Sequence, residues 1–241
     1  MQRPEVVFAP SAIYNLDGSA TLYPCIPLTR TREIVPVLTY RSLLGFLTML
    51  ALTALCYEYL DHPLALAIAS VLMHPQAPDL LQLPDLLLAF VAIVTVCSWT
   101  GRVLLAGKPE REHLRSFLTS AAIVAPASFI AKEICKFVFG RIETRKWLLN
   151  TRLDGFHWLN GVGHFNGFPS GHMMVLAALT AVMWRYYPRL KIYYALALAS
   201  LGIALIVTDY HFISDVIAGG YGGLVVERLF ARRRELLMLS S

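Results

Sequence analysis

The chain has 241 residues, of which 56% are hydrophobic and only 15% are charged, and its formal net charge is +5. Because an ordinary soluble domain carries about 25% charged residues, this composition excludes a typical soluble globular protein and indicates one helical domain in a membrane. The positive charge does not indicate nucleic-acid binding. Most basic residues flank apolar segments, as membrane topology requires, instead of covering one face of a domain.

The N-terminal part of the chain is too polar to enter a membrane. Residues 1–35 mix prolines and charges and do not resemble a cleavable signal peptide, so we expect residues 1–41 to form a cytoplasmic arm. The first apolar run, 42–58, is the first expected span. Four prolines interrupt residues 61–84, and the apolar middle of this stretch is shorter than the roughly 20 residues that a span needs. We expect an interfacial helix there.

Five further apolar runs complete the predicted membrane domain. The second span covers about 85–105, and the third begins near Leu114 and continues as a helix to Gly140. A polar, glycine-rich loop follows as far as Phe168. The remaining spans are expected from Ser170 to before Pro188, over 190–208 and over 212–230, and a basic tail follows over 231–241. The sequence therefore predicts an all-α polytopic fold with six transmembrane helices in residues 42–230.

The basic residues set the expected orientation, because cytoplasmic loops carry the excess of lysine and arginine. With the N-terminus inside, 15 of the 21 basic residues fall on the cytoplasmic side, and both termini are cytoplasmic. The other six lie together on the outer side: Lys132, Lys136, Arg141, Arg145, Lys146 and Arg152. A local excess of cations where topology disfavours it indicates an anionic ligand.

The segment Phe168-Pro169-Ser170-Gly171-His172 stands where the loop enters the fourth span. Ser170 is suited to cap the helix, and the free amides of a helix N-terminus form an anion site that glycine allows a ligand to approach. His172 would lie in the first turn, beside the bound anion. The alternative is a capped helix start that carries an interfacial histidine.

The segment from His211 to Asp215 enters the sixth span. Positions i and i+4 share a helix face, so Asp215 can accept a hydrogen bond from one ring nitrogen of His211 and leave the other as a nucleophile. A structural ion pair at the membrane boundary is the alternative.

The outer basic region can stabilise a phosphoryl group, whose non-bridging oxygens carry negative charge in the transition state. Lys136 and Arg141, at the end of the third helix, are the first candidates. For Arg145, Lys146 and Arg152 the alternative is contact with lipid headgroups. No metal or cofactor is expected: the four cysteines are far apart, and no cluster has the spacing of metal ligands.

Six spans, a lysine-arginine segment, PSGH and HxxxD, in this order, resemble the type 2 phosphatidic acid phosphatase superfamily over roughly residues 60–230. The resemblance implies metal-independent phosphoryl transfer through a phosphohistidine. It implies that His211 is the nucleophile, Asp215 its orienting partner and His172 the acid that protonates the leaving oxygen. Ser170 and the Gly171 amide would bind phosphate.

Two arginines of that family's pattern are absent. The first motif is usually K-x6-R-P, and counting from Lys136 places Glu143 and Thr144 at its arginine and proline. The arginine of the third motif falls on Leu205. We therefore expect the phosphate to be held differently, by Lys136 with Arg141 and with Arg145 as the weaker candidate.

The predicted function is a lipid phosphatase with its site on the extracytoplasmic side of the plasma membrane, the inner membrane of a cell that has two. Its partners would be the bilayer and a lipid phosphate. Two alternatives remain: a phosphotransferase that passes the phosphate to another lipid or sugar, and a non-catalytic lipid-binding or transport protein of the same fold. The missing arginines favour the last, whereas intact His172, His211 and Asp215 oppose it. The identity of the lipid and the oligomeric state are not readable from the sequence.

Overall fold

The computed structural model describes residues 12–14, 20–22, 40–72, 83–161, 163 and 165–240. The chain divides into two units, Met1–Leu43 and Leu44–Ser241. In the first unit, strands β1 (Ala12–Tyr14) and β2 (Ala20–Leu22) pair antiparallel, with Ile13 opposite Thr21. Most of the predicted cytoplasmic arm lies outside the described residues. Apart from this short hairpin, the regular structure of the described residues is helical, which confirms the all-α prediction.

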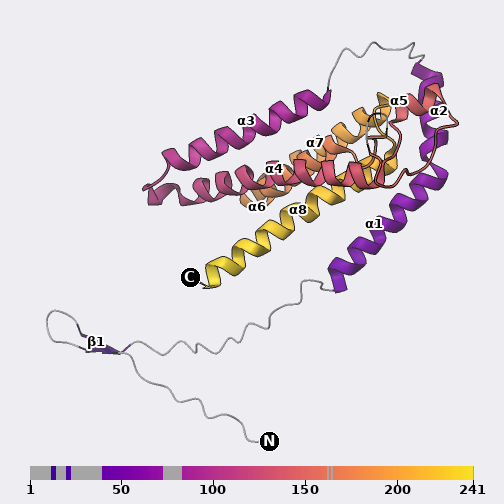
Figure 1. Cartoon of the computed structure of the whole chain (residues 1–241). Helices are drawn as coiled ribbons and strands as arrows, with labels where there is room; N and C mark the ends of the chain where they lie inside the picture. The colour runs from indigo at the N-terminus through magenta and orange to yellow at the C-terminus, as the bar shows by residue number, and fades with distance from the viewer. Residues whose placement is uncertain are drawn as a thin grey trace, which may run out of the picture. The chain divides into compact units, whose positions relative to one another are not determined.

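The helices follow one another in chain order (Figure 1), and all but the first turn of α1 belong to the second unit. They are α1 (Tyr40–Tyr59), α2 (Asp61–Leu72), α3 (Leu83–Leu104), α4 (Glu112–Phe139), α5 (Thr144–Leu149), α6 (Gly171–Tyr186), α7 (Lys191–Val207) and α8 (Ile213–Ser240), with short 3₁₀ turns at Pro109–Arg111 and Pro188–Leu190. Each segment expected to span the membrane is therefore helical. The loop after α4 also contains the six-residue helix α5, which was not expected.

Three of these helices are long and apolar enough to cross a bilayer, in the windows Ser42–Tyr59, Leu86–Leu104 and Pro188–Val207. They belong to α1, α3 and α7. Helix α6 has only 16 residues, and α4 and α8 carry charged side chains along their length. The expectation of six crossings with both termini in the cytoplasm therefore stays a prediction.

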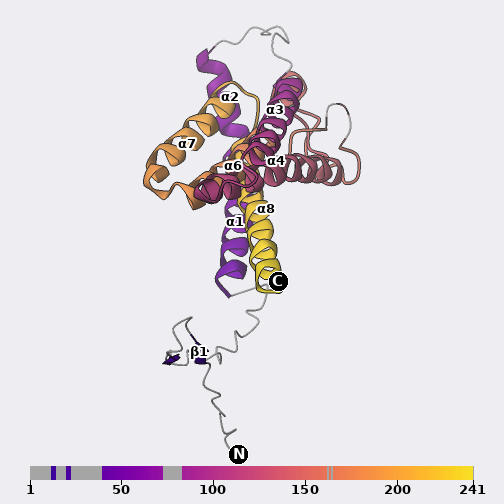
Figure 2. The ribbon, with the colours of Figure 1, turned by 90° about the vertical axis from the view of Figure 1, so that its left-hand side faces the viewer.

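Helix α6 is central, since it contacts α4, α7 and α8 (Figure 2). Small residues allow α6 and α8 to approach closely. A Cβ atom added at Gly219 would lie 2.4 Å from the carbonyl oxygen of Ser170, and one added at Gly223 would lie 2.2 Å from that of Met174. The contact at Gly219 brings the beginning of α8 against the beginning of α6, where the two histidine motifs lie.

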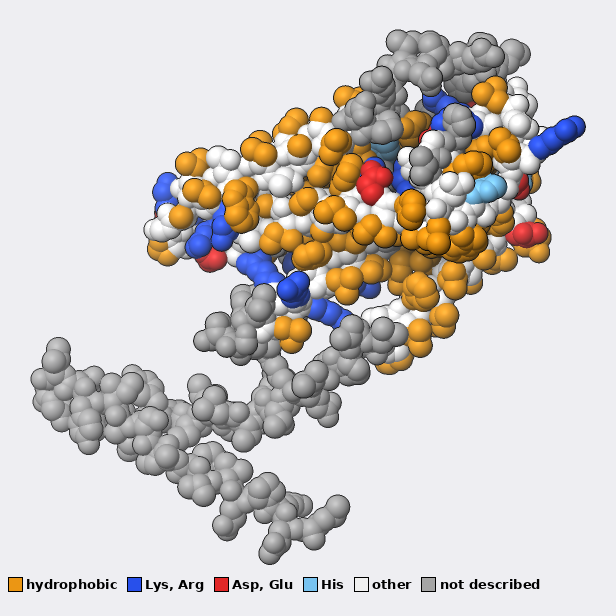
Figure 3. All heavy atoms as spheres, viewed as in Figure 1, with side chains coloured by type: hydrophobic (Ala, Val, Ile, Leu, Met, Phe, Trp, Pro, Cys, Tyr) orange, Lys and Arg blue, Asp and Glu red, His pale blue; other side chains and the backbone are white. Residues whose placement is uncertain are grey.

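The outer faces of the apolar helices expose large hydrophobic side chains. Leu44 on α1, Ile93 on α3 and Ile203 on α7 are each more than half exposed. Figure 3 shows hydrophobic side chains along the helices, with lysines and arginines gathered where α3 leads into α4 and where α8 ends. A water-soluble monomer rarely exposes so much contiguous apolar surface. The apolar helices and this surface indicate a membrane protein.

Helix α8 is longer than the sequence predicted. The expected tail over 231–241 continues the helix as far as Ser240. Arg234 packs back onto the bundle, because its guanidinium donates to the Ser120 hydroxyl (3.0 Å) and to the Tyr186 hydroxyl (2.6 Å). These hydrogen bonds hold the segment against α4 and α6, and its cytoplasmic location stays a prediction.

Candidate active site

The N-terminus of α6 is built as the sequence predicted. Ser170 is the N-cap residue, and its side-chain oxygen accepts a long hydrogen bond of 3.5 Å from the Met173 amide. The Ser170 amide itself donates to the backbone oxygen of Asp215 at 3.0 Å. No residue in the described part of the chain accepts a hydrogen bond from the Gly171 amide. This amide is therefore available to an anion at a helix N-terminus.

Two lysines of α4 lie against Gly171. A Cβ atom added to Gly171 would lie 2.6 Å from Cδ of Lys132 and 3.6 Å from Cε of Lys136. Both side chains are buried. Lys132 pairs with Glu133 at 2.7 Å, whereas the ammonium group of Lys136 has no hydrogen-bond or ion-pair partner among the residues that the structure describes. A buried cation without a partner is costly, so this position favours an anionic ligand.

The sequence assigned no role to Lys132, although it counted Lys132 among the outer cations. Its spacing from Lys136 is i, i+4, which puts the two on one helix face. That spacing was the signal that could have found it. The lysine pair supplies two cations beside the helix N-terminus. Glu143 stands at the position of the first missing arginine, and its carboxylate pairs with Lys146 at 2.6 Å.

The ring of Tyr210 contacts both His172 and His211. Its ring centroid is 5.6 Å from that of His172 and 5.1 Å from that of His211, and both contacts are edge-to-face. His211 is buried and His172 is half-buried. The backbone at Leu205, the other position of a missing arginine, accepts hydrogen bonds from the amides of Tyr210 and His211. The main chain of Leu205 thus positions the histidine although its side chain is apolar.

Asp215 lies behind His211 as predicted, but at a longer distance than a hydrogen bond. His211 Nδ1 is 3.6 Å from Oδ2 of Asp215. That same oxygen accepts the Phe212 amide at 3.0 Å, the reciprocal bond of a capping box at the start of α8. With Nδ1 facing Asp215, Nε2 is the nitrogen left for nucleophilic attack. Burial lowers the pKa of His211 below its ordinary value, although Asp215 acts to raise it.

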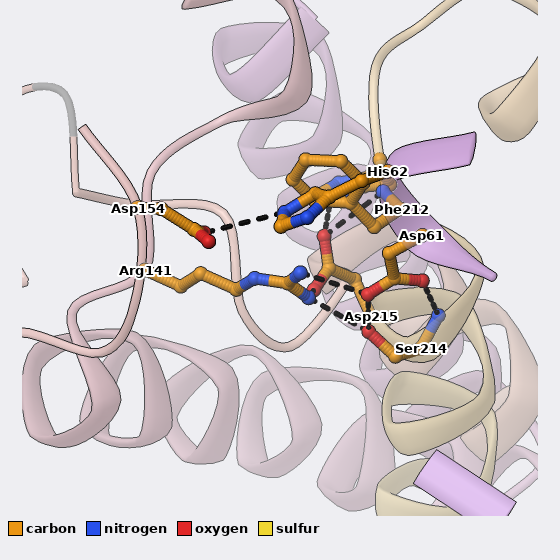
Figure 4. Close-up of polar contacts among 8 residues, drawn as sticks. Asp61, His62, Arg141, Asp154, Phe212, Ser214 and Asp215 are labelled. Carbon is orange, nitrogen blue, oxygen red and sulfur yellow. Dashed lines mark hydrogen bonds and ion pairs between the residues drawn. The ribbon is translucent and has the colours of Figure 1, made fainter. Parts of the chain in front are cut away.

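Arg141 does not lie where a phosphate-binding role requires it. Its side chain is fully buried, and its guanidinium donates to Oδ1 of Asp215 at 2.6 Å, to the Ser214 hydroxyl at 2.7 Å and to Oδ2 of Asp61 at 2.7 Å (Figure 4). Burial alone would lower the pKa of Arg141, but the two carboxylates raise it above its ordinary value. The expectation that Arg141 grips the substrate is therefore corrected: its two terminal nitrogens already donate to Asp215, which stands behind His211, and to Asp61.

Arg145, the weaker candidate, lies in the first turn of α5. It is exposed, and its guanidinium donates twice to the Thr208 carbonyl, at 3.2 and 3.1 Å. It also lies 5.6 Å from the ring centroid of Tyr210. Arg145 thus holds the turn that carries Tyr210 and His211, and its role in binding phosphate stays a prediction.

Asp61 and Ser214 belong to this site although the sequence did not indicate them. Asp61 begins α2, and its carboxylate accepts the Ser214 amide at 3.0 Å as well as the Ser214 hydroxyl. Asp61 is 80 residues from Arg141 and 153 from Ser214. No motif spacing could predict pairings across such separations.

Within the described ranges, no group of three or more His, Cys, Asp and Glu side chains could hold a metal ion. The arrangement instead provides two buried lysines, a helix N-terminus, a histidine with a free nitrogen and a second histidine nearby. These groups are suited to nucleophilic attack on a phosphoryl group that is held by cations and amides.

Comparison with protein families matches residues 114–237 to the PAP2 superfamily. The match covers just over half of the chain, from the first turn of α4 into the last turns of α8, and it includes both histidine motifs. No curated protein and no solved structure gives a significant match.

Proposed function

The chain belongs to the PAP2 superfamily, and on that premise we propose that it is an integral membrane phosphatase that removes phosphate from a lipid. Members of the superfamily are generally phosphatases. The proposed substrate is a phosphomonoester or diphosphate of a lipid, reached from the extracytoplasmic side of the plasma membrane.

One observation carries the proposal. Lys136 is 9% exposed and has no partner among the described residues, and it lies beside the Gly171 amide at the beginning of α6. A phosphate between these groups would neutralise the lysine and accept from the amide. His172 follows Gly171 directly, and both His172 and His211 contact the Tyr210 ring. Lys136 also acts electrostatically on His211.

The reaction proceeds in two balanced steps. Nε2 of His211 forms a bond to phosphorus while the bond from phosphorus to the lipid oxygen breaks, and His172 gives its proton to that oxygen. Water then attacks the phosphorus of the phosphohistidine and gives a proton to His172. The N–P bond breaks, inorganic phosphate leaves, and His211 returns to its neutral form.

The test is phosphate release by purified protein from a lipid carrying ³²P in its phosphate. The proposal expects free phosphate, including in EDTA, since no described group offers the ligand set of a catalytic metal. Label that passes to a second lipid instead would identify a phosphotransferase. Binding of the lipid with no turnover would identify a non-catalytic member. Loss of hydrolysis in EDTA that a divalent ion restores would contradict the metal-independent mechanism.

Two variants test the roles of the histidines in the same assay. His211→Ala should abolish turnover and acid-labile labelling of the protein, because covalent catalysis has no route without its nucleophile. His172→Ala should lower kcat about 10²–10⁴-fold, and the loss should shrink for a good leaving group such as p-nitrophenolate. Label trapped on the His211→Ala protein would overturn the assignment.

A further inference from the structure

Behind His211 lies a chain of three buried charged groups. Asp61, Arg141 and Asp215 are 1%, 0% and 0% exposed. Arg141 Nη2 is 2.7 Å from Oδ2 of Asp61, and Arg141 Nη1 is 2.6 Å from Oδ1 of Asp215 (Figure 4). Ser214 donates to Asp61 through both its amide and its hydroxyl. One guanidinium thus lies between two carboxylates, where little water screens their charges.

The net charge of these three groups determines the electrostatic potential at His211. Arg141 alone would neutralise Asp215, leaving no net charge behind the histidine. Asp61 adds a second negative charge, so Asp61, Arg141 and Asp215 together carry −1. Burial raises the pKa of Asp61 above its ordinary value, and the adjacent Arg141 guanidinium and the two Ser214 donors oppose that rise. The ion pair with Arg141 at 2.7 Å is the contact that favours the carboxylate form of Asp61.

This negative charge can stabilise His211 during phosphoryl transfer. When Nε2 of His211 bonds to phosphorus, the imidazole ring becomes cationic, and its Nδ1 side faces Asp215 at 3.6 Å. A net negative group at this distance, in a site that excludes water, stabilises the developing charge. The same logic orients the histidine of a hydrolytic triad.

We propose that Asp61 is a positioning residue of the reaction, which balances the charge of Arg141 so that Asp215 keeps its negative charge toward His211. The proposal rests on the proposed function for its catalytic consequence. Asp61 lies before the region that matches the family, residues 114–237. The N-terminal helix α2 therefore completes a site whose histidines lie within that region.

Helix α2 is held firmly enough for this role. His62, next to Asp61, stacks on Trp147 of α5 with ring centroids 4.3 Å apart and an interplanar angle of 8°. Ala65, one turn further along α2, lies in a buried cluster with Ile142, Trp147 and Phe212. These contacts tie α2 to the segment after α4 and to the residue that follows His211.

The test varies the net charge of Asp61, Arg141 and Asp215 with one single variant and one double variant. Asp61→Asn changes this net charge from −1 to 0, and Asp61→Asn/Arg141→Gln returns it to −1. Glu58→Gln, one turn earlier on the exposed face of α1, is the matched control for loss of a carboxylate. The readouts are kcat, KM and the acid limb of kcat/KM. Charged or titratable groups that act on His211 are Asp215 of α8, Lys136 of α4 and Glu143 before α5, and the Tyr210 ring contacts it. His172 of α6 contacts the same Tyr210 ring.

Asp61→Asn should lower kcat about tenfold or more with little change in KM. It should move the acid limb to lower pH by on the order of one unit, since loss of negative charge disfavours the protonated ring. The double variant should return the limb toward its original position, and Glu58→Gln should leave it unchanged. A merely structural role for Asp61 would lower the rate without moving the limb, and an unmoved limb in folded Asp61→Asn protein would overturn the proposal.

A second measurement separates this proposal from the proposed function. NMR titration of ¹³C-labelled histidine, with the His211 signal identified from His211→Gln, needs no substrate. The pKa of His211 should be lower in Asp61→Asn than in either the wild type or the double variant. This order would stand even if the protein hydrolysed no lipid, and its absence would overturn the proposal even if hydrolysis were found. If Asp61→Asn does not fold, the double variant alone decides: a His211 pKa within a few tenths of wild type supports the proposal, and a clear fall overturns it.

Discussion

The ammonium group of Lys136 lies in a site that nearly excludes water, and no described residue forms an ion pair or hydrogen bond with it. Its neighbour one turn earlier, Lys132, is buried as well but pairs with Glu133 at 2.7 Å. The two lysines therefore differ in how much they have to gain from a bound phosphate. Desolvated cations contribute most where charge develops in the transition state, so Lys136 should carry the larger part of phosphate binding.

Lys136→Ala should lower kcat/KM about 10²-fold or more, the usual effect of removing one donor from such a site. Lys132→Ala should cost about tenfold, because part of its charge is already balanced. Steady-state kinetics on the purified variants measures both. Arg152→Ala is the control, since Arg152 is exposed and away from the motifs. Near-normal kcat/KM in Lys136→Ala, with Arg145→Ala inactive, would move the phosphate site to the loop.

The protonation of His211 gives a prediction for pH. Burial lowers the pKa of His211 below its ordinary value of 6.5, and only the neutral ring is a nucleophile. The neutral form should therefore persist as the pH falls through 6.5, and the rate should drop only below the lowered pKa. The measurement is kcat/KM against pH, corrected for ionisation of the free substrate by ³¹P NMR. If the profile still shows an acid limb above pH 6.5 after correction for the substrate, and this limb is due to His211, the prediction is wrong.

At the scale of the helices, the site depends on how closely α8 approaches α6. Gly219 faces the carbonyl of Ser170, and a Cβ atom there would lie 2.4 Å from that oxygen. The next residue, Gly220, faces only the flexible end of Met173, at 3.6 Å. The same substitution at these neighbours should therefore have opposite effects.

Gly219→Ala should push the start of α8 away from α6, destabilise the fold by about 1–3 kcal/mol and lower kcat, because the bond from the Ser170 amide to Asp215 lies at this contact. Gly220→Ala should be neutral or raise stability by up to about 1 kcal/mol, since alanine favours a helix. Thermal unfolding in detergent and kcat measure the two effects. Equal stability of both variants would show that the close approach is not needed.

The elements differ in how far the sequence could specify them. The beginnings of α6 and α8 were predicted because capping and i, i+4 spacing are local patterns, and their meeting at one end of the bundle is confirmed by the contact of Lys136 with Gly171 and the bond from Ser170 to Asp215. The role of Arg141 was predicted wrongly because its partner Asp61 is 80 residues away. A cation at a helix end suggests a ligand locally, and only the tertiary structure shows that a carboxylate already occupies it.

The length of α4 bears on which side of the membrane the site faces. Helix α4 has 28 residues, a length of about 42 Å at 1.5 Å per residue, which exceeds the hydrocarbon core of about 30 Å. Its two ends can thus lie on opposite sides. The histidine motifs and Lys136 lie at its C-terminal end, and the segment before its N-terminus lies at the other.

Because 15 of the 21 basic residues fall on the opposite side from the site in the expected topology, we predict that the site is extracytoplasmic. Asn160 lies in the exposed loop after α4, and Glu110 lies exposed before it, so a cysteine at each position reports one end of the helix. In a background with Cys25, Cys56, Cys97 and Cys135 replaced by alanine, Asn160→Cys should react with an impermeant thiol reagent in intact cells. Glu110→Cys should react only after lysis, when the reagent can reach the cytoplasmic side of the membrane. The reverse pattern would invert the orientation and place phosphate release inside the cell, whereas labelling of both in intact cells would show that α4 does not cross the membrane.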